Sequence, residues 1–146
     1  MAKGLIIKGR TPDIIKASDN LKAKLPLLIA NLSKNHFLEG FRKGGGQTDA
    51  SRGGWEQRKK PKGKRAKRRE QGRNILVDTG QLRNDIDVRR TTFQEIVIGT
   101  LNVKYGIYHN EGTEKHPQRE FLGDSRGLMS KIGKLAVKEF NKEFKK

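Results

Sequence analysis

The densest cluster of side chains that could perform chemistry lies within residues 109–120. Its members are two imidazoles and three carboxylates, His109, Glu111, Glu114, His116 and Glu120. Imidazole and carboxylate groups are zinc ligands, so the set could in principle hold a metal ion. The spacing matches no helical ligand motif, however, and Gly112 and Pro117 indicate a loop. We therefore interpret the cluster as a solvated turn and expect no metal or other cofactor.

Signatures of other catalytic sites are missing from the sequence. No serine lies in a G-x-S-x-G elbow, there is no cysteine, and Gly44-Gly45-Gly46 is not followed by the Gly-Lys-Ser/Thr of a phosphate-binding loop. Asp85 and Asp87 are two residues apart, which on a strand places both carboxylates on one face. Such a pair is more often solubilising than catalytic. We therefore expect that the chain is not an enzyme.

A second candidate site is a run of basic residues in the middle of the chain. Lys and Arg exceed Asp and Glu by 10 within residues 41–73, but by only 4 before and 3 after that segment, in a chain of formal net charge +17. Such a run suits contact with phosphates, although no aromatic residues are interleaved with it to stack on bases. A solvated arm, or one that pairs with acidic patches on a neighbouring subunit, is the alternative. The residues that could contact DNA or an acidic partner are Arg58, Lys59, Lys60, Lys62, Lys64, Arg65, Lys67, Arg68 and Arg69.

The segment that carries this charge is unlike a folded core. Between residues 57 and 73 it has almost no apolar side chain. It cannot bury enough apolar surface to offset the entropy lost on ordering. We therefore interpret residues 42–73 as a long basic arm, with a short helical piece within residues 63–71. Trp55 is the exception, and we expect its indole to pin the arm onto the core rather than to face a partner, because burial favours so large a ring.

The composition of the whole chain limits the number of domains, the size of the core and the kind of partner. Its 146 residues fit a single domain over residues 1–146. Apolar residues make up only 32% and charged residues 34%, so part of the chain should lie outside the core. The absence of cysteine fits a reducing compartment, and no apolar stretch is long enough to span a membrane, so no membrane partner is expected. The basic excess predicts a polyanionic partner.

Two amphipathic helices are predicted at the ends of the chain. Thr11-Pro12-Asp13 is a good helix start, and apolar residues recur every three or four positions from Ile14 to Leu32. This pattern predicts a helix over residues 12–38, with a bend near Pro26. Residues 123–125 could cap a second helix that runs almost to the end of the chain.

The region between the arm and the last helix reads as a small sheet. Alternating β-branched residues predict strands at 85–88 and 95–98, joined by a turn at 91–94. A third strand is predicted at 105–109 and a fourth extended piece at 117–121. The fold class is therefore α+β. A small antiparallel sheet of three to four strands is packed by the long N-terminal helix and the C-terminal helix, with the basic loop inserted between the first helix and the sheet.

Four segments of the second half occur in a familiar order. Residues 75–84 read ILVDTGQLRN, and residues 97–100 read VIGT. Residues 105–112 read YGIYHNEG, and residues 117–123 read PQREFLG. These resemble, in turn, the L-x-x-T/S-G-x-L-x-x-S-I, v-x-I/V-G-T/S, Y-A-x-x-H-x-x-G and P-x-R-x-F-L-G stretches of the virion-morphogenesis, or tail-completion, proteins of tailed phages.

The resemblance extends upstream and covers about residues 12–140. Phe41 and Gly53-Gly54-Trp55 are similar to the family's F-x…G-x-x-W after the first helix. The sequence departs from the pattern at Gly106, where Ala is usual, and at Glu120, where Pro is common. Its Lys/Arg arm is also unusually dense.

The resemblance implies structural roles for the motif residues. Gly80, Gly99 and Gly112 would serve turns, and Tyr105, Phe121 and Leu122 would serve the core. Arg119 would pair with a carboxylate, either within the fold or across a subunit interface. The full set of motif residues is Trp55, Gly80, Leu82, Gly99, Tyr105, His109, Gly112, Pro117, Arg119, Phe121 and Leu122.

The resemblance also implies a function. It predicts a structural virion protein of the phage neck or tail, made in the host cytoplasm, which completes the tail or joins it to the head. Such a protein would assemble as a homo-oligomeric ring, hexameric by analogy with tail symmetry, around the DNA channel. Its partners would be portal, connector or tail-tube subunits and genomic DNA. The alternative is a small basic nucleic-acid-binding protein whose resemblance to the family is accidental.

Overall fold

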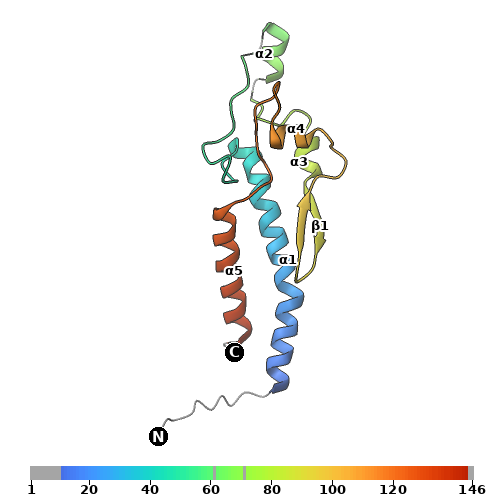
Figure 1. Cartoon of the computed structure of the whole chain (residues 1–146), viewed down its shortest axis with the longest axis vertical. Coiled ribbons are helices and arrows are strands. Elements are labelled where there is room, and N and C mark those ends of the chain that lie inside the picture. The colour runs from blue at the N-terminus through green and yellow to red at the C-terminus, as the bar shows by residue number, and fades with distance from the viewer. Residues whose placement is uncertain (1–10, 61, 71, 145–146) are drawn as a thin grey trace.

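The computed structural model describes residues 11–60, 62–70 and 72–144. Residues 1–8, where the apolar run Leu5-Ile6-Ile7 predicts a short extended segment, lie outside them. The molecule is elongated, with one long helix as its axis (Figure 1). The described elements are α1 (Thr11–Lys43), α2 (Lys64–Glu70), α3 (Gln81–Asp85), β1 (Asp87–Thr91), β2 (Ile96–Gly99), α4 (Gly106–Glu111) and α5 (Arg126–Phe144).

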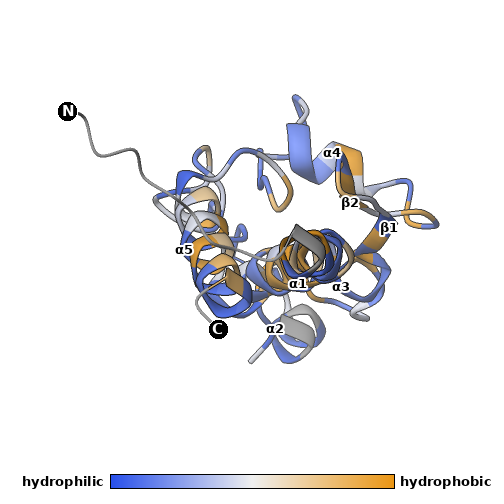
Figure 2. Ribbon diagram, turned by 90° about the horizontal axis from the view of Figure 1, so that it is seen from below, coloured by the Kyte–Doolittle hydropathy of each residue, from blue (hydrophilic) through white to orange (hydrophobic). Residues whose placement is uncertain are grey.

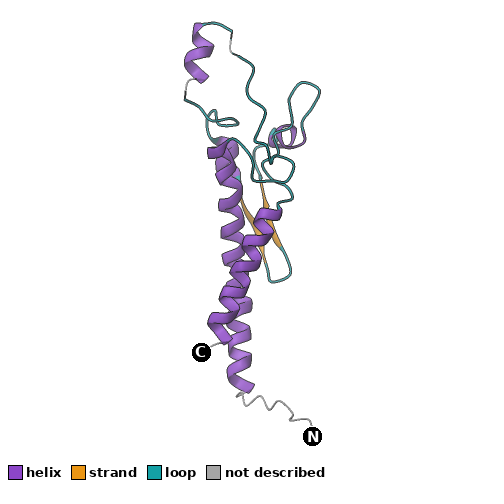
Figure 3. Ribbon diagram, turned by 90° about the vertical axis from the view of Figure 1, so that its left-hand side faces the viewer, coloured by secondary structure: helices purple, strands orange, loops and turns teal. Residues whose placement is uncertain are grey.

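Helix α1 is the element on which the others pack. Helix α5 and the β1–β2 hairpin both lie along α1, on different sides of it (Figures 1 and 3). Helix α1 covers Thr11–Lys43, whereas the helix was predicted over residues 12–38, so it already includes Thr11 and runs five residues farther at its C-terminal end. It continues through Pro26, although a proline removes one backbone donor from the helix interior. Packing of α1 against α5 and the hairpin stabilises a helix that its own sequence would interrupt.

The buried stripe of α1 lies in its C-terminal half. Ala30, Phe37 and Phe41 are buried at intervals of seven and four residues, which places them on one face of the helix. The predicted stripe began too early, since Ile14 is exposed, and Leu28 farther along is only half-buried. Ile14 is exposed because the first turns of α1 extend beyond both elements that pack on the helix (Figure 1).

Helix α5 begins and packs largely as the sequence indicated. The Ser125 hydroxyl accepts a hydrogen bond from the Leu128 amide at 3.1 Å, which confirms the predicted cap. Leu128 is buried against α1, whereas Phe140 is half-exposed. In its place Glu139 is buried, and its carboxylate accepts a 2.8 Å hydrogen bond from the Lys24 ammonium group on α1.

The sheet has two strands among the described residues, not three to four. β1 and β2 pair in antiparallel fashion, from Asp87 opposite Gly99 to Thr91 opposite Ile96, with an irregularity between Val88 and Arg90. The hairpin itself is therefore confirmed. Its turn is closed by the Thr92 amide, which donates to the Glu95 carbonyl at 2.7 Å. Gly99 ends β2 and does not form a turn.

The third predicted strand is wrong, because residues 106–111 form helix α4. The alternation of apolar and polar residues there matched a strand. In the structure Gly106 is buried and His109 and Asn110 are half-buried, so the inward positions are three or four residues apart, as in a helix. Gly106 also allows a close approach, since a Cβ there would lie 2.9 Å from the Leu82 Cδ1 atom.

The fourth extended piece, predicted at residues 117–121, does not join the sheet. This segment is irregular, and several backbone donors in and just after it are satisfied by residues of α4. The Arg119 amide donates to the His109 carbonyl at 2.7 Å, and the Asn110 side-chain oxygen accepts from the Phe121 and Leu122 amides at 2.9 and 3.0 Å. The Asn110 side chain thus accepts hydrogen bonds from backbone amides that a neighbouring strand would otherwise have to satisfy.

The described part of the chain is an α+β structure whose main core lies where the N-terminal and C-terminal halves meet. Phe41 contacts the Trp55 ring edge-on at a centroid distance of 5.3 Å and the Phe121 ring at 5.6 Å. The cluster draws on α1, the arm, α3 and the segment before α5. Its buried members are Phe41, Trp55, Ile75, Leu82, Ile86 and Phe121.

Candidate functional site

The arm leaves α1 through a glycine-rich turn that folds back under Trp55. Gly45 has φ +104°, and a Cβ at this position would lie 2.7 Å from the Trp55 backbone nitrogen. The Trp55 amide donates to the Gly44 carbonyl at 2.6 Å. Only glycine fits both the left-handed conformation and this close approach.

Trp55 fixes the first part of the arm to the body of the protein. Its side chain is only 4% exposed, and its indole N–H donates to the Glu120 carbonyl at 2.9 Å. The prediction that Trp55 pins the arm is therefore confirmed. Residues 44–57 consequently belong to the folded body, and the freely exposed part of the arm starts later in the chain.

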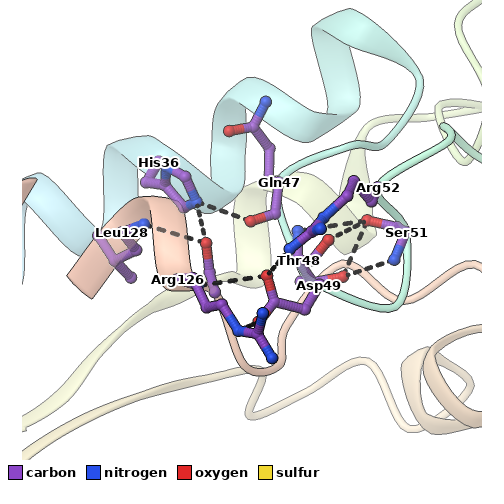
Figure 4. Close-up of polar contacts among 9 residues, drawn as sticks. His36, Gln47, Thr48, Asp49, Ser51, Arg52, Arg126 and Leu128 are labelled. Atoms are coloured by element: carbon purple, nitrogen blue, oxygen red, sulfur yellow. Dashed lines mark hydrogen bonds and ion pairs between the residues drawn. The ribbon is translucent and has the colours of Figure 1, made fainter. Parts of the chain in front are cut away.

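A polar network joins the same part of the arm to the start of α5 (Figure 4). The His36 Nε2 atom lies 2.8 Å from the Gln47 carbonyl and 3.0 Å from the Ser125 hydroxyl. The Asp49 carboxylate accepts from the Arg126 amide at 3.3 Å, and its backbone amide donates to the Asp124 carbonyl at 2.7 Å. Hydrogen bonds from Arg126 and Arg52 lower the pKa of Asp49, although partial burial acts in the opposite direction. The network holds the arm in place from a second side.

The remainder of the arm stands away from the body. Helix α2 lies at the far end of the molecule from the exposed start of α1 (Figure 1), and it is largely hydrophilic (Figure 2). The cations with exposed side chains are Lys59, Lys60, Lys62, Lys64, Arg65, Lys67 and Arg68, and Arg69 lies in α2 beside them. These positions are within 11 residues of one another, so they concentrate positive charge at one end of the molecule.

Arg58 differs from the other cations of the arm. Its guanidinium group is half-buried and donates from Nη2 to the Asn74 carbonyl at 2.7 Å and to the Val77 carbonyl at 3.4 Å. It therefore joins the start of the exposed part of the arm to the segment that follows the arm. It also lines a pocket of about 430 Å³ together with His109 and Arg119, two of the motif residues.

Arg119 is the buried cation of this pocket. It is 8% exposed, and its Nε atom donates to the Glu56 carbonyl at 3.0 Å. Burial lowers the pKa of Arg119, the nearby Glu56 carboxylate acts in the opposite direction, and the charge of Arg58 lowers it further. Among the described residues no carboxylate forms an ion pair with Arg119. Of the two pairings that the resemblance left open, the one within the fold is not formed among the residues that the structure describes.

The His/Glu cluster does not assemble as a metal site in the described part of the chain. The His109 and His116 ring centroids are 5.8 Å apart, and no group of three or more His, Asp or Glu side chains converges there or elsewhere among those residues. The His109 Nδ1 and Glu120 Oε2 atoms are buried without a hydrogen-bond partner. Burial, and then the charges of His116 and Arg119, lowers the pKa of His109.

The motif residues lie in different environments in the structure. Leu82 and Phe121 are in the core, and Leu122 packs against it. Gly80 and Gly112 have φ of +83° and +78°, as their predicted role in turns requires. Tyr105 was expected in the core, but it is 43% exposed because it precedes α4 and faces outward. Pro117 is half-buried in the irregular segment after α4.

Three residues with structural roles were missed in the sequence. Asn110 directly follows the strand predicted at residues 105–109, and His36 lies within the predicted first helix, but no sequence pattern assigned a role to either residue. Asp85 was assigned to a strand face with Asp87, yet it ends α3 and accepts backbone hydrogen bonds from Leu101, Asn102 and Val103 at 2.8 to 2.9 Å. No sequence signal identifies such long-range acceptors, because their donors lie in other segments.

Comparison of the chain with protein-family models, with curated protein sequences and with solved structures finds no match. None of the helices in the described residues is both long and apolar enough to cross a membrane.

Proposed function

We propose that this chain is a structural protein of a tailed-phage particle, which completes the tail or joins it to the head as a subunit of a ring around the DNA channel. The observation that carries the proposal is the convergence of the motif residues. Trp55, Leu82 and Phe121 come from three distant segments of the resemblance and meet in one core cluster. Residues that serve one shared fold would be expected to meet in this way.

Exposed apolar side chains support the assembly part of the proposal. Leu101, Tyr105, Ile107 and Tyr108 are 43 to 69% exposed, and all lie in or just before α4. A second exposed group on α5 includes Met129, Val137 and Phe140. Clustered exposed apolar residues are typical of surfaces that are covered in an assembly. We therefore propose a homo-oligomer and assign α4 to its subunit interface.

The exposed basic part of the arm supplies the contact with a polyanion. In a ring, the α2 ends of the subunits would gather positive charge at one rim. Genomic DNA or the acidic surface of a connector or tail-tube subunit would neutralise it. The second candidate function, a free nucleic-acid-binding protein, rests on the same basic arm but needs no ring.

Mass spectrometry of purified particles tests the first function. The chain should be present in virions at several copies per particle, in constant ratio to the other tail proteins. Its absence from particles would contradict the proposal.

Light scattering of the purified protein separates the two functions, because a ring subunit mixed with its partners should give a mass above the monomer mass of 16.5 kDa. A free nucleic-acid binder should bind duplex DNA as a monomer, with a steep salt dependence.

A further inference from the structure

The pocket beside the start of the basic arm has a surplus of positive charge. Arg58 and Arg119 both line it, together with His109. Neither guanidinium group forms an ion pair with a described carboxylate. Asp78 is the acidic residue on the wall, and its carboxylate is paired with Arg73. Two cations that repel one another in a partly dry site would be stabilised by a bound anion.

The donors are fixed in place before any ligand arrives. The Arg119 Nε atom is held by the Glu56 carbonyl, and its backbone amide is held by the His109 carbonyl. Arg58 is held by the Asn74 carbonyl through one Nη atom. Each guanidinium group has five N–H donors, so each retains unused donors after these contacts. Pre-organised donors lose little entropy when a ligand binds.

The wall of the pocket also contains strained backbone. Leu76 has φ +60°, and it is the single described non-glycine residue with a positive φ. Such a conformation is costly for a leucine and is often found at binding sites. It lies in the segment whose Asn74 and Val77 carbonyls accept from Arg58. The strain is therefore part of the structure that positions one of the two guanidinium groups.

We propose that the Arg58–His109–Arg119 pocket binds a phosphate group of a nucleic-acid backbone. Two guanidinium groups that line one pocket suit a tetrahedral oxyanion with several acceptor oxygens. A volume of about 430 Å³ admits the phosphate with part of its sugar. The exposed cations that follow Arg58 continue the positive surface outward, as a chain of phosphates requires. This proposal concerns DNA contact and stands whether or not the chain is a ring subunit.

Binding of inorganic phosphate and of a short DNA duplex to the full chain tests the pocket. Arg58→Gln should weaken both affinities about tenfold or more, because it removes a charge-assisted hydrogen bond. Arg65→Gln removes the same charge from the exposed helix α2 and is the matched control. It should weaken duplex binding only slightly and leave phosphate binding unchanged. Equal effects of the two variants on phosphate would overturn the proposal.

A second measurement does not depend on a variant that could unfold. The chain has three histidines, so their ring signals can be followed by NMR during titration with inorganic phosphate. The His109 signals should shift and saturate, whereas those of His36, which lies in the separate network beside α5, should not. Absence of saturation at His109 would contradict the proposed site. Binding of a glutamate-rich peptide in preference to both phosphate and duplex would instead assign the pocket to a protein carboxylate, and would also overturn it.

Discussion

At the scale of single residues, the fold depends on a few side chains that join distant segments. Trp55 links the arm to the segment before α5 through its hydrogen bond to the Glu120 carbonyl. Asn110 and Asp85 hold irregular loops by accepting backbone hydrogen bonds. In each case one buried or half-buried side chain pairs with a backbone acceptor or with backbone donors that would otherwise lack a partner. Substitutions at these positions should therefore affect stability more than their exposure alone suggests.

Replacement of Trp55 by phenylalanine should destabilise the protein by about 1–3 kcal/mol. The ring contact with Phe41 would be retained in part, but the Glu120 carbonyl would lose its donor. The free energy of unfolding from urea denaturation measures the effect. Phe93→Leu is the control, because Phe93 is exposed in the hairpin turn, and it should change stability by less than about 0.5 kcal/mol. Equal effects of the two substitutions would contradict the role assigned to the indole N–H.

The Asp85 carboxylate should make stability depend on pH. Backbone hydrogen bonds, led by that from the Val103 amide, lower the pKa of Asp85 in the folded protein, and burial opposes them. Because the folded pKa is below the unfolded value of about 3.9, the contribution is fully present above about pH 5. It is lost as the pH falls through and below the unfolded pKa. Asp85→Asn should therefore reduce the loss of stability between about pH 5 and pH 2, as urea denaturation at each pH would measure.

At the scale of elements, the sequence predicted the helices and strands whose formation depends on neighbouring residues alone. The helix start at Thr11, the cap at Ser125 and the β1–β2 hairpin each have a cause within a few residues of sequence. The strand predicted at residues 105–109 is wrong because, over so few residues, the apolar pattern fits the two-residue period of a strand and the three-to-four-residue period of a helix equally well. In the structure Gly106 is packed so closely that a Cβ there would lie 2.9 Å from Leu82 Cδ1 and 3.4 Å from Phe121 Cζ, a position that fits the helix. This packing depends on residues more than ten positions away, which no local pattern contains.

The candidate site, like the secondary structure, was predicted only in part from the sequence. The density of Lys and Arg identified the arm, and α2 lies within the residues expected to be helical. The sequence did not distinguish Arg58 from the cations that follow it. That distinction arises from the carbonyls of Asn74 and Val77, which are brought to Arg58 only when the arm folds back.

Neutralisation of the exposed arm should separate binding from folding. Replacing Lys62, Lys64 and Arg65 with glutamine should change the free energy of unfolding by less than about 0.5 kcal/mol per site, because these side chains are exposed. Duplex binding should weaken, and the slope of log affinity against log salt should fall by about 0.9 for each phosphate that the variant no longer neutralises. Fluorescence anisotropy over a range of salt concentrations measures both. An unchanged slope would mean that α2 does not contact the phosphates.

At the scale of the whole molecule, the exposed cations and the exposed apolar side chains lie mostly on different elements. The cations are concentrated in the arm, at the α2 end of the molecule (Figure 1). Exposed apolar side chains include those on α4 and α5. The two sets adjoin at α4, because Tyr105 and His109 line the pocket that holds Arg58 and Arg119. This arrangement fits a subunit that binds copies of itself through the apolar side chains of α4 and a polyanion through the arm and the adjoining pocket.

Ile107→Asp should weaken self-association by about tenfold or more, because it places a charge in the apolar α4 surface. Ile107 is 54% exposed in the single chain, so the substitution should leave the fold intact, as circular dichroism would verify. Gln94→Asp introduces the same charge in the exposed hairpin turn and should leave association unchanged. Sedimentation velocity over a range of protein concentrations gives the masses. If both variants associate like the parent chain while Phe140→Asp does not, the interface lies on α5. If all three associate like the parent chain, neither apolar surface holds the assembly together.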